Sequence, residues 1–293
     1  MRVRAVAVEE EFLLVDAATL RPVSRVEPVP SVVRDLADLD AALRDRRRRL
    51  AAAAAAGGAL LVATGTSPFH NPARCGCSVR VAVGCAEEAG AVRERLSPWL
   101  PALVAIAANS PFWRGADTGY ASYRTQLRDG PGGQVPQQAR AGHRDREPSV
   151  EVRVADVARE VDDAVLVAAL VRALVDTAVR QWRDGIPPVP VRPELARLAT
   201  WRASRSGLSG VLVDIAARRA VPARVLVGRL VRHVHDSLDD TGDLALVEEL
   251  VAGLLARGTG ATRQREAYRR HGRLEDVVRL LADRTAPLAP VAT

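Results

Sequence analysis

Three adjacent glutamates interrupt an apolar segment near the start of this 293-residue chain. The segment Val3–Val15 reads as one β-strand, in which Glu9 and Glu11 project from one face and Glu10 from the other. Two like charges about 4 Å apart repel by roughly 4 kcal/mol at an effective dielectric constant near 20. A strand tolerates such a cost where the carboxylates face water or share a cation. The pattern therefore leaves two interpretations open, a solvated strand end or an oxygen-rich site suited to Mg²⁺.

Alternation in two later segments predicts more strands with one apolar and one polar face. In residues 75–84 the odd positions, Cys75 to Val83, form the apolar face. In Val150–Val154 the valines alternate with Glu151 and Arg153, which share the polar face. Shorter strands are expected at 23–29, which carries Glu27, and at 59–64. These features predict an α+β fold whose mainly antiparallel sheet carries a site on its wet face and is backed by helices.

Helical periodicity covers much of the remaining chain. Residues 128–149 are rich in Gly, Pro, Gln and Arg and are expected to form a flexible loop, and 186–193 a proline-rich connection. The sequence shows no internal repeat, and its length permits one large domain or two small ones. The expected helices span 35–56, 86–96, 98–108, 162–183, 193–203, 221–237, 243–256 and 263–282.

The chain contains no lysine, so all 42 of its basic residues are arginines. This composition excludes a Walker A phosphate loop and Schiff-base chemistry, both of which require lysine. A net charge of +7 would permit nucleic-acid binding, but the arginines are scattered and aromatic residues make up only 3% of the chain. We therefore predict no nucleic-acid partner, and we expect the densest run, Arg46–Arg49, to form a solvated helix face.

Cysteine, histidine and apolar spacing narrow the possibilities further. Cys75, Cys77 and Cys85 are too few for a disulfide framework or a zinc site. His233 and His235 are two positions apart in a helical pattern and so do not share a face. No apolar run approaches 18 residues, which argues against a membrane-spanning helix. The first residues lack the apolar core of a signal peptide, so a cytoplasmic location is expected.

Several stretches in the same order along the chain resemble the carboxylate–amine ligases of the glutamate–cysteine ligase type 2 family. Together they extend over nearly the whole sequence, which makes the resemblance more specific than any single motif. The stretches are Val8–Asp16, Cys75–Cys77, Ala108–Trp113, Asp117–Gln126, Val150–Asp156 and Arg257–Gln264.

The resemblance implies a single domain over 1–293 with a glutamine-synthetase-like catalytic sheet. This sheet would use ATP and Mg²⁺ to join the glutamate side-chain carboxylate to cysteine or another amine. The acyl phosphate formed from ATP would be attacked by the amine, while Mg²⁺ and arginines offset charge on the phosphoryl group. It also implies small-molecule partners, with no membrane partner, and leaves self-association open. The implied metal ligands are Glu9, Glu11, Glu27 and Glu151. The implied catalytic residues are Arg153, expected near the phosphates of the nucleotide, and Tyr123 and Arg124, expected to shape the substrate pocket. Arg80, at a position where the chain departs from the family, is expected to add positive charge at the nucleotide.

The chain departs from the family pattern at several of these strands. Ser78 and Arg80 stand where the family has histidines, Ser67 where it has another histidine, and Ala7 where it has glycine. Segments are also missing between Ser24 and Glu27, between Phe69 and Cys75, and between Gln126 and Val150. Two hypotheses follow besides an arginine-rich nucleic-acid binder, namely a trimmed ligase with weak activity or a degenerate relative that binds a nucleotide or a partner protein.

Overall fold

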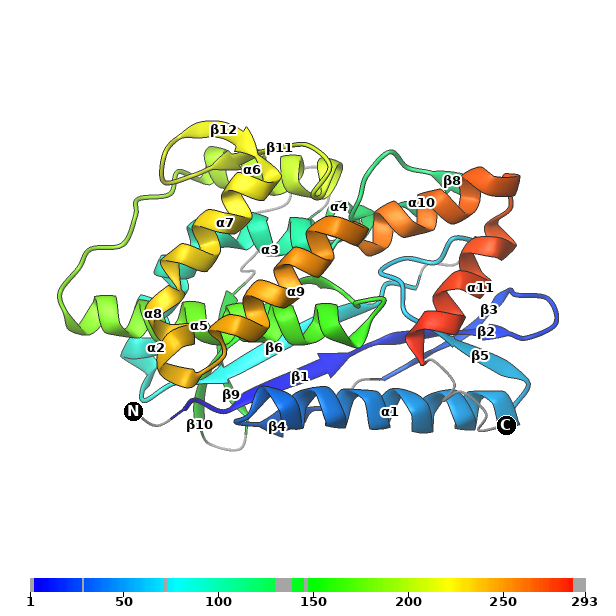
Figure 1. Ribbon diagram of the computed structural model, residues 1–293, viewed down its shortest axis with the longest axis horizontal. Coiled ribbons are helices and arrows are strands. Elements are labelled where there is room, and N and C mark those ends of the chain that lie inside the picture. The colour runs from blue at the N-terminus through cyan, green and yellow to red at the C-terminus, as the bar shows by residue number, and fades with distance from the viewer. Residues whose placement is uncertain (1–2, 28, 71–72, 130–138, 145–146, 287–293) are drawn as a thin grey trace.

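A five-stranded antiparallel sheet forms the centre of the computed structural model, which describes residues 3–27, 29–70, 73–129, 139–144 and 147–286 (Figure 1). The strand order is β4-β1-β6-β10-β9. The sheet and the surrounding helices confirm the α+β prediction. The strand bounds are β1 Val6–Glu10, β4 Ser31–Val33, β6 Gly76–Ala82, β9 Ala139–Arg144 and β10 Glu147–Asp156.

The inner face of this sheet is apolar, as the alternation predicts. Cross-strand pairing places Val8 opposite Val79, and Val79 opposite Val152, so that β1, β6 and β10 align their valines on one side. Helix α5 (Val161–Arg183) packs against this face, and most of its residues are buried. Helices α1 (Leu36–Ala56), α2 (Ala86–Leu96) and α9 (Leu244–Arg257) contact α5, so it lies at the centre of the helical layer. Such a helix is apolar over most of its surface because it has little contact with water.

The strand expected over 3–15 is in fact two strands in two different sheets. The chain leaves the central sheet after Glu10, and Phe12–Asp16 forms β2, which lies between β3 (Pro22–Val26) and β5 (Ala59–Val62) in a three-stranded sheet. Figure 1 shows β2 continuing the line of β1 towards β3 and β5. At the junction, the Glu11 amide donates to the Gly76 carbonyl over 3.0 Å. The prediction of a single strand was wrong because apolar continuity does not reveal a change of strand partners.

Residues from both ends of the sequence build a second apolar core around the smaller sheet. Phe12 and Leu13 of β2 pack with Val277 and Leu281 of α11 (Leu274–Thr285). Helix α10 (Gly260–His271) adds Ala267 to this cluster. The N-terminal strands and the last helix therefore depend on one another for burial.

The predicted helices are present with some differences at their bounds, but the segments expected as single helices over 221–237 and 263–282 each form two. The remaining helices are α3 Leu100–Ile106, α4 Tyr123–Asp129, α6 Pro193–Ser206, α7 Ala223–His233 and α8 His235–Thr241. A short antiparallel pair, β11 (Val211–Asp214) with β12 (Arg219–Pro222), precedes α7. Among the described residues no helix is both long and apolar enough to span a bilayer.

The loop expected over 128–149 is wrong where the structure describes it. Residues 139–144 form β9, and β10 begins at 147, so both add to the central sheet. Residues 130–138 and 145–146 of the expected loop lie outside the described residues. Glycine and proline suggested a loop, but pairing with β6 extends β10 beyond the alternating valines.

Candidate active site

A small pocket lies on the polar side of the central sheet, where β6 begins and the chain passes from β1 to β2. Its volume is about 30 Å³, enough for about two water molecules or one ion. The lining joins acidic and basic side chains from segments that are far apart in sequence. The lining residues are Glu9, Glu11, Gly76, Cys77, Ser78, Arg124 and Arg153.

Glu11 is held at the mouth of this pocket by Gly76. Its carboxylate accepts the Gly76 amide over 2.8 Å, while its own amide donates to the Gly76 carbonyl. A side chain at Gly76 would crowd Arg124, because a Cβ there would lie 3.0 Å from the Arg124 Nη1. Glycine at this position therefore lets the acidic junction and Arg124 approach the same pocket.

Arg80 lies between two of the glutamates that the resemblance implied as metal ligands. Its Nη1 is 3.5 Å from a Glu9 oxygen, and its Nη2 is 3.3 Å from a Glu151 oxygen. Ser78 donates its hydroxyl to the same Glu151 oxygen over 3.2 Å. Arg80 stands opposite both Glu151 and Ala7 in the strand register, and the small Ala7 side chain leaves space for the guanidinium to reach Glu9.

A second arginine bridges the other two glutamates of that set. Arg25 donates to Glu27 over 2.7 Å and lies 3.8 Å from a Glu11 oxygen. The hydrogen bond to Glu27 raises the pKa of Arg25, so its charge is firmly held. Glu27 does not line the pocket, and its side chain is 74% exposed. The predicted four-glutamate set is thus divided into two pairs, each with its own guanidinium.

The described residues do not form a ready site for a protein-bound metal ion. They contain no group of three or more His, Cys, Asp or Glu side chains arranged to hold one. The nearest donor set is already neutralised, since Arg80 contacts Glu9 and Glu151, and Arg153 lies 3.8 Å from Glu151. Arg80 is thus engaged with carboxylates, and Arg153, whose side chain is 54% exposed, lines the pocket.

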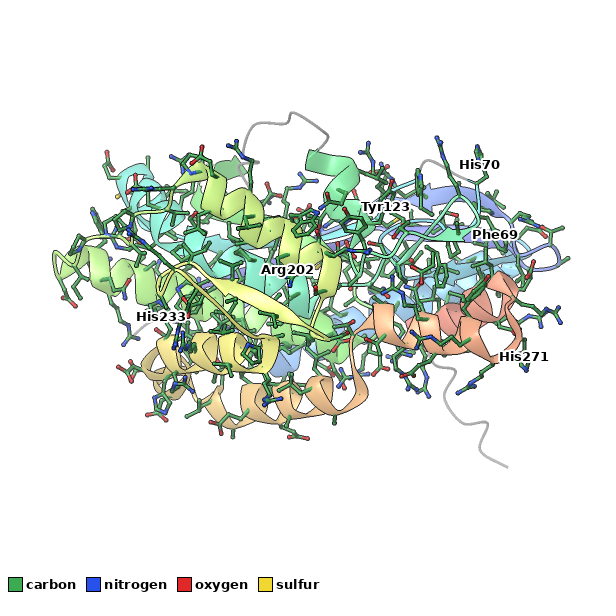
Figure 2. All side chains as sticks on the ribbon, turned by 90° about the horizontal axis from the view of Figure 1, so that it is seen from above. Phe69, His70, Tyr123, Arg202, His233 and His271 are labelled. Atoms are coloured by element: carbon green, nitrogen blue, oxygen red, sulfur yellow. The ribbon has the colours of Figure 1, made fainter. Side chains whose placement is uncertain are left out.

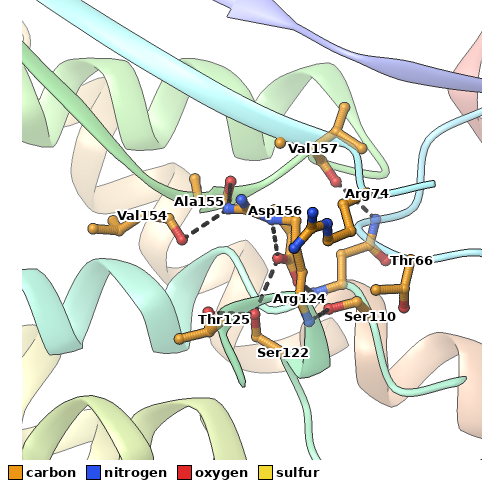
Figure 3. Close-up of polar contacts among 12 residues, drawn as sticks. Thr66, Arg74, Ser110, Ser122, Arg124, Thr125, Val154, Ala155, Asp156 and Val157 are labelled. Carbon is orange, nitrogen blue, oxygen red and sulfur yellow. Dashed lines mark hydrogen bonds and ion pairs between the residues drawn. The ribbon is translucent and has the colours of Figure 1, made fainter. Parts of the chain in front are cut away.

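Arg124 is a fixed, buried component of the pocket wall (Figure 3). Its Nε donates to Asp156 over 2.8 Å, and its Nη2 donates to the carbonyl oxygens of Val154 and Ala155. Asp156 also accepts hydrogen bonds from Ser122 and Ser110, at 3.0 and 2.7 Å. This network fixes the direction of the guanidinium, which an isolated long side chain could not maintain.

Tyr123 packs away from the pocket lining, within a group of aromatic residues. Its ring centroid is 6.1 Å from that of Trp113 and 5.8 Å from that of Tyr120. Figure 2 shows Tyr123 far from His233 and His271, which lie at opposite ends of the molecule. His233 stacks on Trp99, and burial lowers its pKa. His235, the other histidine of the predicted helical pair, lies 3.3 Å from Asp236.

Residues from the stretches that resemble the family form a hydrogen-bond network beneath the pocket. Asn109 donates to the carbonyl oxygens of Ala63 and Val157, at 3.0 and 2.9 Å, and its amide donates to Asp156. Gln264 donates to Asn109 from α10 over 2.7 Å. Gly65 has no space for a side chain, because a Cβ would lie 2.6 Å from the Asp156 carboxyl carbon. These contacts connect four distant segments beneath Asp156.

Glu10, the middle residue of the acidic triplet, has a buried partner that the sequence reasoning missed. Its carboxylate faces the helices and accepts both Nη2 and Nε of Arg47 from α1. Arg47 also donates to the carbonyl oxygens of Ala158, Arg159 and Thr285. The expectation of a solvated face at Arg46–Arg49 is wrong for Arg47, whose side chain is 1% exposed. The signal was present, because Arg47 follows the buried Leu43 by four positions in the helix.

Cys75 and Cys77 are buried thiols, as expected from their apolar face. Burial raises the pKa of Cys75 to about 12 and also raises that of Cys77. Both therefore stay protonated near neutral pH, which argues against a nucleophilic or metal-binding role. Cys85 is less buried and caps α2 through its sulfur.

Sequence comparison finds a family model, described as glutamate-cysteine ligase family 2 (GCS2), that matches residues 70–145 and 136–280. A protein of Frankia alni named "Putative glutamate--cysteine ligase 2-2" is 49% identical over 245 residues, which cover 73% of this chain and 63% of that protein. The match therefore spans less than two thirds of that relative's length.

A second relative aligns over nearly its entire length. The protein of Saccharopolyspora erythraea named "Putative glutamate--cysteine ligase 2-1" is 35% identical over 356 aligned positions, covering 96% of this chain and 94% of that protein. Since this chain can supply at most 293 of those positions, the relative has segments that the chain lacks.

Structural comparison agrees at the level of the fold. A glutamate–cysteine ligase from Francisella tularensis, solved in complex with AMP, superposes with a TM-score of 0.64. The superposition covers 99% of this chain and 91% of that one, at 10% sequence identity. The likeness concerns the fold alone.

Proposed function

The chain belongs to glutamate–cysteine ligase family 2, and on this premise we propose that it is an ATP-dependent carboxylate–amine ligase. The proposed reaction joins the side-chain carboxylate of glutamate to the amine of cysteine or of another small molecule. ATP is cleaved to ADP and phosphate, and the product with cysteine is γ-glutamylcysteine. The nucleotide complex of the Francisella tularensis neighbour supports the use of ATP on this fold.

The observation that carries the proposal is the meeting of carboxylates and guanidiniums in one pocket. Glu9 and Glu11 approach from the β1–β2 junction, while Arg124 and Arg153 approach from α4 and β10. Phosphoryl transfer depends mainly on positioning and on offsetting negative charge. A wall with a fixed arginine and an exposed one suits this task better than a uniformly acidic pocket would.

The two arginines have different roles in this scheme. Arg124 is buried and held by Asp156, so it contributes a preorganised charge at a constant position. Arg153 is exposed and can follow the γ-phosphoryl group as it moves from ATP to the glutamate carboxylate. The acyl phosphate has a good leaving group, so the amine nitrogen attacks the acyl carbon, phosphate leaves, and the nitrogen loses a proton. Mg²⁺ enters the proposal as part of Mg²⁺-ATP, and no protein-bound ion is assigned.

We propose that one domain performs this reaction. The pocket requires β1, β6 and β10, while Asp156 beneath it is connected through Asn109 to Gln264 near the end of the chain. The small apolar core likewise unites β2 with α11. Removal of either end would expose apolar surface and disturb the support of Arg124.

The test is ADP release from purified protein supplied with Mg²⁺-ATP and glutamate, alone and with cysteine or a panel of amines. We expect ADP only when glutamate and an accepted amine are both present, and the Glu11→Gln variant should lose this activity. The matched control is Glu94→Gln, because Glu94 is an exposed acid on α2 outside the pocket. Equal activity of wild type and Glu11→Gln would contradict the role proposed for the pocket.

The position of Arg80 favours a second candidate function, in which the protein binds a nucleotide but does not catalyse the ligase reaction. Its guanidinium lies between Glu9 and Glu151, the acids that the resemblance implied as metal ligands. This candidate predicts that folded protein binds ATP, measured by calorimetry, but releases no ADP with any acceptor. Binding to nucleic acid, the third hypothesis, would instead show an affinity that falls steeply with salt.

A further inference from the structure

The arrangement of charges around Arg80 differs from that of a metal site. Glu9 on β1 and Glu151 on β10 lie on either side of β6, and both contact the guanidinium of Arg80 on β6, whose side chain is 19% exposed. Arg153 lies 3.8 Å from Glu151. Two carboxylates and two guanidiniums therefore form a group with no net charge. A divalent cation gains little by entering such a group, because it would first have to displace a positive charge.

We propose that Arg80 is a built-in cation that takes the place of a divalent metal ion between Glu9 and Glu151. The guanidinium joins the two carboxylates across the sheet and so keeps this part of the pocket in its folded geometry without a metal. The inference rests on the proposed function only for identifying the pocket as the nucleotide site. The charge arrangement itself is independent of turnover.

The surroundings of Arg80 hold it in this position. Ala7 lies opposite it on β1, and the guanidinium extends diagonally to within 3.5 Å of Glu9, two residues further along that strand. Glu151 lies opposite it on β10 and is oriented by the Ser78 hydroxyl. Arg25, which joins Glu11 to Glu27, is the exposed counterpart, with a longer contact of 3.8 Å to Glu11. Although Arg25 has the shorter hydrogen bond, to Glu27, its side chain is 39% exposed, so Arg80 is the better enclosed of the two cations.

The experiment measures Mn²⁺ binding to nucleotide-free protein by electron paramagnetic resonance, with Mn²⁺ as the probe. Wild-type protein is expected to show no Mn²⁺ binding that depends on Glu9 or Glu151. The Arg80→Gln variant removes the guanidinium that both carboxylates share and should bind one Mn²⁺ at least about tenfold more tightly than wild type, roughly 1.4 kcal/mol. Adding Glu9→Gln to that variant should remove the gain. Arg80→His is a second variant that removes the fixed charge and offers a nitrogen ligand.

The matched control is Arg180→Gln. Arg180 also bridges two carboxylates, contacting Asp176 at 2.7 Å and Asp240 at 2.6 Å, but it lies away from the pocket. An equal gain of Mn²⁺ binding in Arg180→Gln would overturn the proposal, because removing any arginine shared by two carboxylates would then suffice.

Two further results would also overturn the proposal. One is Mn²⁺ binding by wild type that disappears in Glu9→Gln or Glu151→Gln, and this test does not depend on the stability of any Arg80 variant. The other is a folded Arg80→Gln protein with no gain. Absence of ADP release would contradict the ligase proposal alone, since turnover is not part of this measurement.

Discussion

Glu9 and Glu10 are adjacent in sequence, yet they face opposite sides of one sheet and have opposite surroundings. Glu10 points into the helical layer, where Arg47 and three backbone carbonyl groups complete a buried network. Glu9 points to the pocket, where it contacts Arg80 beside solvent. Both acids are paired with arginine, so the pairing alone does not distinguish a structural acid from a functional one.

The difference lies in what else each arginine contacts. Arg47 is occupied by groups that belong to the fold, including the Thr285 carbonyl near the end of α11. Arg80 contacts the carboxylates of Glu9 and Glu151, and Glu9 belongs to the pocket wall. A buried charged group whose hydrogen-bonding atoms all have partners in the protein stabilises the fold. A charged group beside a pocket can exchange its partners for those of a ligand. The comparison leads to four predictions, ordered from the largest expected effect to the smallest.

The largest effect is expected for Arg47→Ala on the buried side of the sheet. It leaves the Glu10 carboxylate without its counter-charge in the interior, which should lower the free energy of unfolding by about 3–5 kcal/mol. Urea denaturation measures this. Arg48→Ala is the control, because Arg48 is exposed and its loss should cost no more than about 0.5 kcal/mol. If Arg47→Ala and Arg48→Ala lowered the free energy of unfolding equally, the buried Glu10–Arg47 pair would not be a structural contact.

Glu9→Gln should show the reverse pattern on the pocket side. We expect ADP formation to fall by about 100-fold, roughly 2.7 kcal/mol, while the free energy of unfolding changes by less than about 1 kcal/mol. Glu10→Gln is the matched variant, and its main effect should be on stability. A loss of stability in Glu9→Gln as large as that in Glu10→Gln would show that Glu9 too is structural.

Asp156→Asn concerns an acid that is both structural and close to the pocket, since Asp156 is buried and also orients Arg124. The amide accepts fewer charge-assisted hydrogen bonds, so we expect a loss of about 2 kcal/mol in the free energy of unfolding. ATP affinity, measured by calorimetry on the folded variant, should also fall. Asp184→Asn, at an exposed helix end, should change neither quantity. Unchanged ATP affinity would separate Arg124 from nucleotide binding.

Asp163 tests whether a nearby arginine always keeps a buried acid ionised. Burial raises its pKa from 3.8 to about 6, although Arg257 acts in the opposite direction. The folded state then binds protons more tightly than the unfolded state, so the contribution of this group to stability falls as the pH rises through 6.

The expected effect is small but has a definite sign. Between pH 5 and pH 7, the stability of Asp163→Asn relative to wild type should rise by about 1 kcal/mol. Urea denaturation at the two pH values measures it, with Asp162→Asn, an exposed neighbour, as the control. A relative stability that falls over this range would mean that the Arg257 pair outweighs burial.

Local pattern was enough to identify the sheet and the direction of its side chains. Alternation at 75–84 and Val150–Val154 correctly assigned the apolar face, because side chains on a strand alternate whatever their partners. It also assigned Glu10 to the face opposite Glu9. Periodicity could not reveal that the chain changes sheets at Glu11, since this depends on which strands are available for pairing.

The candidate site was only partly accessible to sequence reasoning. Glu9, Glu11, Arg124 and Arg153 were all named beforehand, and the structure places them around one pocket. Arg25 was not named, because its role depends on contacts with Glu11 and Glu27 that arise when β3 pairs with β2. Arg47 was assigned to the wrong environment for the same reason, as its partners come from β1 and from residues 158–285.

The sequence by itself determined the family, the α+β class and the residue types that one face of the sheet presents. These follow from motif order and from side-chain alternation, both of which are local properties of the chain. Only the tertiary structure decided which acid is paired with which arginine, because guanidinium groups reach across strands to partners far away in sequence. In a chain whose basic residues are all arginines, that choice of partner separates a charge that stabilises the core from one that lines a pocket.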